Sequence, residues 1–158
     1  MTLPYDTIFS RYMGIIKDPK ELSLNESDLL EMYNERLHMV LGDPRVSAKF
    51  SNIEFDDEIQ TITFALKNSV NDISDVEFVV KLFAMGMGIE WLKPQIDSLD
   101  FTLRMVGGKE EKSLQNSYKQ MQDRLKRLEK QHAADGRGSD DIKGKTAQNF
   151  SVPFCFFI

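Results

Sequence analysis

Residues 75–96, DVEFVVKLFAMGMGIEWLKPQI, decide the fold of this chain. Apolar side chains cover nearly every face of a helix built from this stretch, and such a helix is expected at the centre of a domain. Gly86 and Gly88 each cost about 1 kcal/mol relative to alanine within a helix. We therefore expect a neighbouring backbone to approach this helix closely at the two glycines.

The ends of this central helix are predicted from its flanking residues. Ser74 and Glu77 have the spacing of a capping box and are expected to open the helix. Pro94 is predicted to kink or end it, because proline lacks the backbone N–H that a helix interior requires. Residues 97–112, which contain Gly107 and Gly108, are then interpreted as a connection.

Two shorter helices are predicted upstream. The first is capped by Asp6 and ends at Asp18-Pro19, since the residue before proline disfavours helical backbone. The second begins near Leu24, behind a Ser-x-x-Glu capping box, and ends at Gly42 and Pro44. Their apolar faces are formed by Phe9, Tyr12, Met13 and Ile16 in the first helix and by Leu29, Met32, Tyr33, Leu37, Val40 and Leu41 in the second.

The apolar period changes between residues 53 and 66. Alternation of apolar with polar or small residues, around Phe55 and again around Phe64, favours a short β-hairpin. A helix built on Ile59, Ile62, Thr63 and Leu66 is the alternative. Three consecutive acids, Asp56, Asp57 and Glu58, interrupt the alternation and are interpreted as a turn or a docking surface.

A final helix is predicted from a narrow apolar seam. Its members recur at spacings of four and three residues, too briefly for an independent coiled coil, so the helix should lie against the other helices or a neighbouring subunit. The seam comprises Leu114, Tyr118, Met121, Leu125 and Leu128, and the predicted core joins Phe83, Trp91, Leu114, Tyr118, Met121 and Leu125. Basic residues on the other faces are assigned to a subunit interface or a DNA channel: Lys119, Arg124, Lys126, Arg127 and Lys130.

The chain is predicted to end in an extended arm. Residues 132–149 are small and polar and are typical of a flexible linker. The last nine residues are strongly apolar and are expected to dock on a partner through Phe150, Val152, Phe154, Phe156, Phe157 and Ile158. The predicted fold class is mainly α, a small helical bundle over residues 1–131 with a short β-hairpin insertion and this C-terminal arm.

Charge is distributed unevenly along the 158 residues. The net charge is -5, but residues 1–103 carry 9 Lys and Arg against 18 Asp and Glu, whereas residues 104–158 carry 11 against 7. This asymmetry is consistent with oppositely charged surfaces meeting between copies, with a basic edge facing phosphates, or with a solvated helix face.

No sequence pattern indicates a reaction. His38 and His132 are isolated and are interpreted as structural or solvated, and the single cysteine has no internal partner. The glycines at 86–88 and 107–108 lack the remaining residues of nucleotide-binding motifs. We therefore expect no enzyme, no catalytic residue, no cofactor and no metal. The start of the chain lacks a signal peptide and no apolar stretch is long enough to span a membrane, which predicts a soluble protein.

Several stretches together resemble the head–tail connector, or adaptor, proteins in the neck of tailed bacteriophages, especially those of Gram-positive hosts. The resemblance is carried by DDEIQTITFALKNSVNDISDVEFVVKLFAMGMGIEWLKPQIDS at residues 56–98 and by GGKEEKSLQNSYKQMQDRLKRLE at 107–129. YDTIFSRYMG at 5–14 and LNESDLLEMYNERL at 24–37 fit the same pattern. It covers roughly residues 5 to 131.

The resemblance implies a structural subunit of the virion. It implies a homo-oligomeric ring of about twelve copies beneath the portal, around the DNA channel, which joins the capsid to the tail. The implied partners are the chain itself, the portal protein, the next neck or tail-completion protein, and packaged DNA through non-specific contact, with no membrane. Synthesis in the host cytoplasm would precede assembly, and a C-terminal arm would bind the portal.

Two other functions stay open from the residues alone. One is a cytoplasmic helical protein-interaction module that binds its partner through the apolar tail. The other is a DNA-binding regulator whose contacts go to phosphates and are independent of base sequence.

Overall fold

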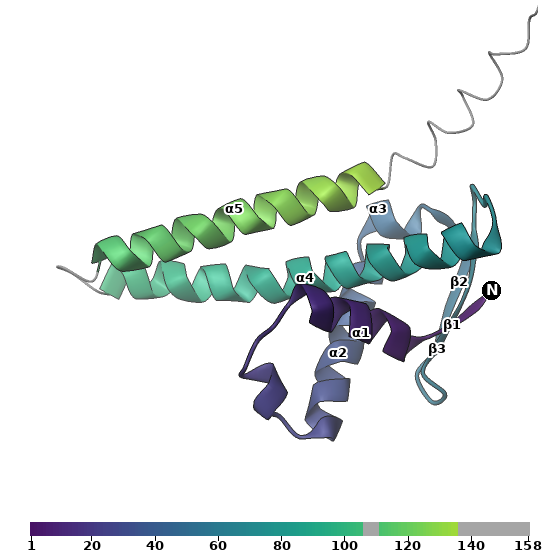
Figure 1. The fold of residues 1–158 in the computed structure, drawn as a ribbon, viewed down its shortest axis with the longest axis horizontal. Helices are drawn as coiled ribbons and strands as arrows, with labels where there is room; N and C mark the ends of the chain where they lie inside the picture. Colours follow the sequence, from purple (N-terminus) through teal and green to yellow (C-terminus); the bar gives the residue numbers. More distant parts are fainter. Residues whose placement is uncertain (106–110, 136–158) are drawn as a thin grey trace, which may run out of the picture.

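The computed structural model describes residues 1–105 and 111–135 and shows a mostly helical protein with a small antiparallel sheet (Figure 1). This confirms the predicted fold class for that part of the chain. In order, the elements are β1 (Thr2–Pro4), α1 (Tyr5–Ile15), the 3-10 helix η1 (Glu21–Ser23), α2 (Glu26–Leu41), α3 (Pro44–Ser47), β2 (Phe50–Asp56), β3 (Thr61–Leu66), α4 (Asp72–Met105) and α5 (Glu111–Asp135).

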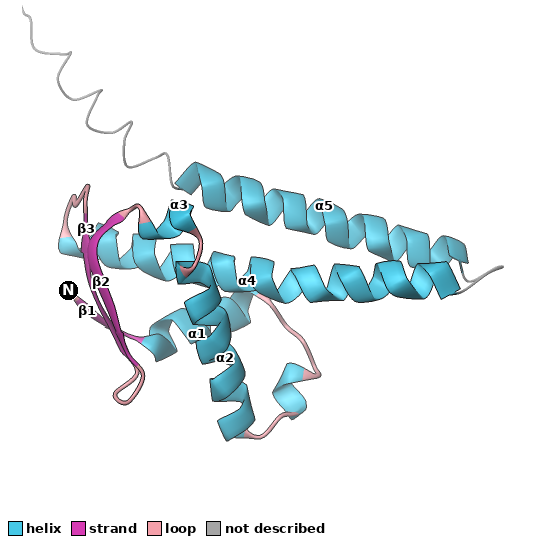
Figure 2. Cartoon of the chain, turned by 180° about the vertical axis from the view of Figure 1, so that it is seen from behind, coloured by secondary structure: helices cyan, strands magenta, loops and turns pink. Residues whose placement is uncertain are grey.

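Helix α4 is central, as its apolar composition predicts. It packs against α1 and α2, and α5 runs antiparallel beside it (Figures 1 and 2). The helix begins earlier than predicted, because the Asn71 side chain, and not Ser74, accepts the capping hydrogen bond, from the Ser74 N–H at 2.9 Å.

Pro94 does not end α4, so the prediction that residues 97–112 form a connection is wrong for 97–105 and for 111–112, which are helical. The apolar face continues past the proline through Ile96, which is buried, and the half-buried Leu99 and Leu103. Packing of this face against α5 offsets the loss of one helical hydrogen bond at the proline. Residues 106–110 lie outside the described part of the chain.

The two upstream helices are present, but other residues cap them. Pro4 occupies the cap position of α1 and Asp6 lies in its first turn, while the helix ends at Ile15, before Asp18-Pro19. Asn25 caps α2 by accepting a hydrogen bond from the Asp28 N–H at 2.9 Å, so the predicted capping box is not used. Gly42 lies at the end of α2, as predicted.

The period-two stretch forms a β-hairpin, which confirms the strand prediction over the helical alternative. Strands β2 and β3 pair antiparallel, with Phe55 opposite Ile62 and a bulge near Phe50. Asp56 accepts hydrogen bonds from two of the following turn amides, and Gln60 adopts a positive φ of 53° to complete the turn. Strand β1, which the sequence did not predict, pairs with β3 on its other edge, so the strand order is β1-β3-β2.

The core lies where α1, α2, α4 and the sheet meet. Phe83 is fully buried there, as predicted, whereas Trp91 is half-buried against the core. The prediction that α5 contributes to the core is too strong: its seam residues are only half-buried, because α5 packs mainly on α4 and the flanks of the seam remain near water. These half-buried residues are Leu114, Tyr118, Met121, Leu125 and Leu128.

Helix α5 also continues to Asp135, so the predicted boundary between residues 131 and 132 falls within a helix. The rest of the predicted linker and the whole apolar tail, including Phe150, Val152, Phe154, Phe156, Phe157 and Ile158, lie outside the described residues.

Candidate functional site

The antiparallel pair of α4 and α5 projects past α1 and α2 and is the most distinctive surface of the molecule (Figure 2). The α5 seam residues are spaced so that they occupy one face of the helix, directed at α4. Near its C-terminal end, the His132 ring Nε2 lies 3.2 Å from the Leu82 carbonyl oxygen of α4. Burial lowers the pKa of His132, which favours a neutral ring that donates this hydrogen bond.

Arg124 is an internal anchor and not part of an exposed basic face. Its Nη2 donates to the Ile15 carbonyl at 3.0 Å, which satisfies an acceptor at the end of α1. Its guanidinium carbon lies 6.0 Å from the centre of the Trp91 ring, and the Trp91 indole N–H donates to Asp18 at 3.2 Å. Arg124 therefore connects α5 to α1 and α4, and its assignment to an interface or a DNA channel is corrected.

The other four predicted basic residues lie on the exposed side of α5. At 100° per residue, Lys119, Lys126 and Lys130 fall about 120–160° from the centre of the seam, and Arg127 lies beside them. Lys112 continues this face toward the start of the helix, and Asp123 is the single acid among them. We call Lys112, Lys119, Lys126, Arg127 and Lys130 the basic stripe; all five are exposed, and no ion pair within the described residues involves them.

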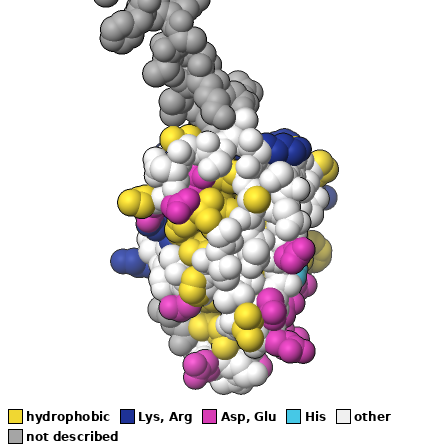
Figure 3. Space-filling view, turned by 90° about the vertical axis from the view of Figure 1, so that its right-hand side faces the viewer, with side chains coloured by type: hydrophobic (Ala, Val, Ile, Leu, Met, Phe, Trp, Pro, Cys, Tyr) yellow, Lys and Arg dark blue, Asp and Glu magenta, His cyan; other side chains and the backbone are white. Residues whose placement is uncertain are grey.

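Acidic side chains concentrate elsewhere on the described chain. The turn between β2 and β3 exposes Asp56, Asp57 and Glu58, and the outer face of α2 exposes Glu31 and Glu35. In a view toward the sheet end, acidic side chains predominate in the lower half of the face (Figure 3). The acid-rich first part of the sequence thus exposes acidic side chains at the hairpin turn and on α2, whereas the basic stripe lies on α5.

Exposed apolar side chains mark the two opposite ends of α4. At its start, Val70 is 57% exposed and Ile73 is 81% exposed. At its other end, Phe101 is 63% exposed and Met105 is 71% exposed. Ile73 and Phe101 are separated by about 42 Å along the helix axis. We call Val70 with Ile73 the leading patch and Phe101 with Met105 the trailing patch.

Two polar clusters that the sequence did not predict hold the N-terminal elements together. Tyr12 and Arg36 meet the buried Glu21, with the Arg36 Nη1 at 2.5 Å from the Glu21 carboxylate and at 2.7 Å from the Tyr12 hydroxyl. Desolvation raises the pKa of Tyr12 far above its ordinary value, so its hydroxyl stays protonated. No local pattern marks this cluster, since its members come from three separate elements.

The second cluster joins α1, α2 and the hairpin turn. The Tyr5 hydroxyl donates to Asp57 at 2.7 Å, and His38 Nε2 lies 3.1 Å from the same carboxylate. The hydrogen bond from Tyr5 holds the pKa of Asp57 below its usual value. His38 therefore has a defined partner, and part of the acidic turn is fixed to the body of the protein.

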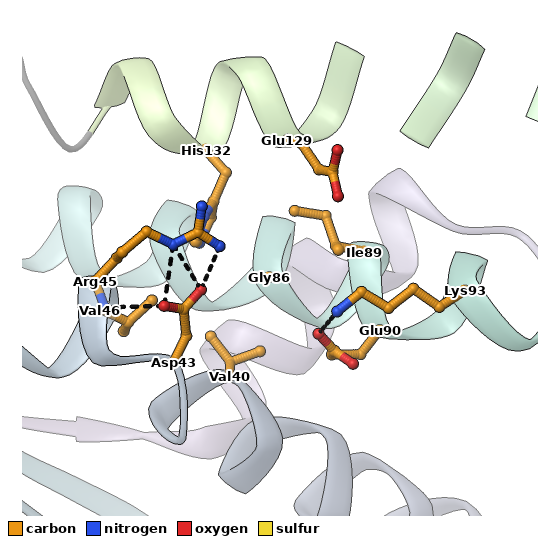
Figure 4. A pocket seen from close by; sticks show the side chains of 10 residues that line it. All are labelled: Val40, Asp43, Arg45, Val46, Gly86, Ile89, Glu90, Lys93, Glu129 and His132. Carbon is orange, nitrogen blue, oxygen red and sulfur yellow. Dashed lines mark hydrogen bonds and ion pairs between the residues drawn. The ribbon is translucent and has the colours of Figure 1, made fainter. Parts of the chain in front are cut away.

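A small pocket of about 50 Å³ lies beneath the end of α5 (Figure 4). Charged side chains that line it form ion pairs with one another: Arg45 pairs with Asp43 at 2.7 Å, and Lys93 pairs with Glu90 at 2.5 Å. A volume of this size accommodates about one or two water molecules. The described residues include no cluster of His, Cys, Asp or Glu arranged to hold a metal.

Gly86 lines the same pocket, and the packing around it differs from the backbone approach that was predicted for the two glycines. A Cβ added there would lie 2.5 Å from the Val40 Cγ1, so α2 crosses α4 closely at this point. The close neighbour is a side chain, not the expected backbone. A Cβ at Gly88 would meet its nearest atoms at 3.8 Å, an ordinary contact, so Gly88 is not required by packing.

No protein-family model matches this chain, and neither the curated proteins nor the solved structures searched contain a match. None of the helices among residues 1–105 and 111–135 combines the length and apolarity of a membrane span.

Proposed function

We propose that this chain is a structural subunit that assembles with copies of itself and acts as a head–tail connector in the neck of a tailed bacteriophage, joining capsid to tail around the DNA channel. The observation that carries the self-assembly is the pair of apolar patches at opposite ends of α4. When one patch of each copy fits a different patch of the next, contacts continue from copy to copy and close into a ring at a suitable angle.

Contact between the leading patch of one copy and the trailing patch of another is proposed on apolar burial and not on charge. The leading patch is accompanied by the exposed Asp72. At the trailing patch Arg104, whose side chain is 77% exposed, is already paired with Asp100 at 2.6 Å. An exposed pair of this kind contributes little to association, so the apolar side chains carry the contact.

The size of the patches suggests an assembly that needs a template. Complete burial of one large apolar side chain contributes about 1.5–3 kcal/mol, so four partly exposed side chains contribute roughly 4–8 kcal/mol. Loss of translational and rotational freedom opposes association by about 4–15 kcal/mol. We thus expect the dilute chain to be mainly monomeric and to form a ring on a surface that holds many copies together, such as a portal.

The C-terminal tail and the absence of catalysis are parts of the same proposal. We expect residues 150–158 to bind the portal and the polar clusters to serve the fold, with no reaction catalysed. A chain truncated before residue 150 should keep its thermal unfolding midpoint and lose binding to purified portal rings. Equal portal binding by the full and truncated chains would remove the tail from the proposal.

The decisive experiment is to image tailed-phage particles that contain this chain. We expect a ring of this chain at the tail vertex of the capsid. Its presence only outside particles would refute the connector function and favour a cytoplasmic interaction module.

The assembly mode has a separate test in the purified full chain. Chemical cross-linking at high protein concentration should give a ladder of oligomers, which Ile73→Asp or Phe101→Asp should suppress. Met39→Asp is the matched control, because Met39 is 50% exposed on α2 and outside both patches. A ladder unchanged by both patch variants would refute the end-to-end contact.

A further inference from the structure

We infer that the basic stripe of α5 binds the sugar–phosphate backbone of double-stranded DNA without reading base sequence. The inference rests on the proposed function in one respect: the DNA would be the duplex that passes through the ring. The DNA contact itself is a property of a single chain and is measurable without a ring.

The geometry of the stripe fits an extended polyanion. From Lys112 to Lys130 it extends about 27 Å along a straight helix, with steps of about 10 Å between Lys112, Lys119 and Lys126. The DNA duplex carries one phosphate per about 1.7 Å of axis, so a row of cations at this spacing has phosphates within reach along its whole length. With Asp123 as its single acid, the stripe carries a net charge of +4 on a chain whose net charge is -5.

The composition of the stripe also favours phosphate over a protein partner. Four of its five cations are lysines, and lysine is depleted in the buried centres of protein interfaces. Aromatic or large apolar residues, which anchor protein partners, are concentrated on α5 in the seam that faces α4. Of the two arginines on α5, Arg124 is used inside the molecule, so Arg127 is the single arginine of the stripe.

The stripe lacks the features needed to read bases. Lysine side chains act as flexible point charges, and α5 is attached along its length to α4, which prevents it from entering a major groove alone. Contacts of this kind position a protein along a duplex and carry no sequence information. Loose, sequence-independent attraction is also compatible with DNA that moves past the protein.

The test is a fluorescence-anisotropy titration of the full chain with a labelled random-sequence duplex at about 50 mM salt, repeated across a salt series. With three to five phosphates contacted, the slope of log affinity against log salt should lie between about -3 and -5. The variant Lys119→Gln/Lys126→Gln/Lys130→Gln should bind the duplex at least about tenfold more weakly. Its slope of log affinity against log salt should be less negative by about three. Glutamine preserves helix propensity, so the variant should keep its thermal unfolding midpoint.

The matched control is Lys17→Gln/Lys20→Gln/Lys67→Gln. It removes the same charge from exposed lysines outside α5, and we expect its DNA binding to stay within about threefold of the original chain. An equal loss of DNA affinity in the two triple variants would show that net charge alone governs binding and would overturn the inference. Undetectable DNA binding by the unchanged chain at about 20 mM salt would also overturn it.

Two further outcomes separate this inference from the proposed function. If the stripe variant binds DNA normally but loses the cross-linked ladder, the stripe is a subunit interface and the DNA inference fails while assembly stands. If DNA binding depends on the stripe but particles never contain the chain, the DNA site stands and the connector function fails.

Discussion

Replacement of Gly86 by alanine should destabilise the protein, and the same change at Gly88 should stabilise it. The added Cβ at position 86 would lie 2.5 Å and 2.8 Å from the two Val40 methyl groups. Val40 is 3% exposed and β-branched, so it has little freedom to move away. At Gly88 the nearest atoms, on Ile15 and Ile16, lie at 3.8 Å, where a methyl group makes ordinary contact.

The magnitudes follow from two opposing effects. Insertion of a methyl group into a packed core costs about 1–3 kcal/mol, and exchange of glycine for alanine within a helix gains about 1 kcal/mol. Gly86→Ala should therefore lower the free energy of unfolding by up to about 2 kcal/mol. Gly88→Ala should raise it by about 1 kcal/mol, because only the favourable effect operates there.

Urea denaturation followed by circular dichroism measures both variants. A second substitution, Val40→Ala, separates the clash from other causes: alone it leaves a cavity and destabilises, but combined with Gly86→Ala it should show a favourable coupling of about 1–2 kcal/mol. Equal stability of the two glycine variants, or no coupling with Val40→Ala, would refute the close approach of α2 to α4.

Three more predictions concern the contacts that hold the elements in place. Arg124→Met should weaken the attachment of α5 by about 1–2 kcal/mol, because a charged hydrogen bond and a cation–π contact are lost together. Hydrogen exchange of the α5 amides should then be faster. Unchanged exchange would show that Arg124 does not hold α5 to the rest of the protein. Glu21→Ala should lower the free energy of unfolding by about 2–4 kcal/mol, because it removes the carboxylate that pairs with Arg36, whose side chain is only 17% exposed. Arg104→Gln, which removes one member of an exposed ion pair, is the control and should lower the free energy of unfolding by less than about 0.5 kcal/mol. Burial lowers the pKa of His132 from 6.5, so the unfolded chain binds a proton at this side chain more readily than the folded chain. The free energy of unfolding should therefore fall as the pH drops below about 6.5. His132→Gln should flatten this part of the curve of unfolding midpoint against pH, and an unchanged curve would show that His132 does not cause the fall.

Much of the fold was predictable because local sequence patterns indicate which face of a helix or strand is apolar. Residues 75–96 indicate a central helix, and the alternation around Phe64 indicates a strand. The spacing of the α5 seam likewise fixes the opposite face as polar, which placed four of the five assigned basic residues correctly on an exposed surface. Arg124 was the exception, since its position at the flank of the seam does not show that α1 ends within its reach.

Helix ends and long-range pairings were less predictable. Ser23, Ser74 and Asp6 each had a plausible capping position, but Asn25, Asn71 and Pro4 occupy the actual ends. Competing caps differ by only about 1 kcal/mol, so tertiary contacts determine which one forms. Strand β1 is three residues long and exists only because β3, far away in the sequence, lies beside it.

The sequence by itself determined the order of the main helices and the hairpin, the central place of α4 and the basic face of α5, because apolar periodicity and charge spacing are local properties. Only the tertiary structure decided that α4 continues past Pro94, that Gly86 but not Gly88 is required by packing, and that Arg124 turns inward. Each of these features depends on which segment, distant in the sequence, packs against a given helix. That packing is determined by the apolar surface buried over the whole chain, which no local pattern contains.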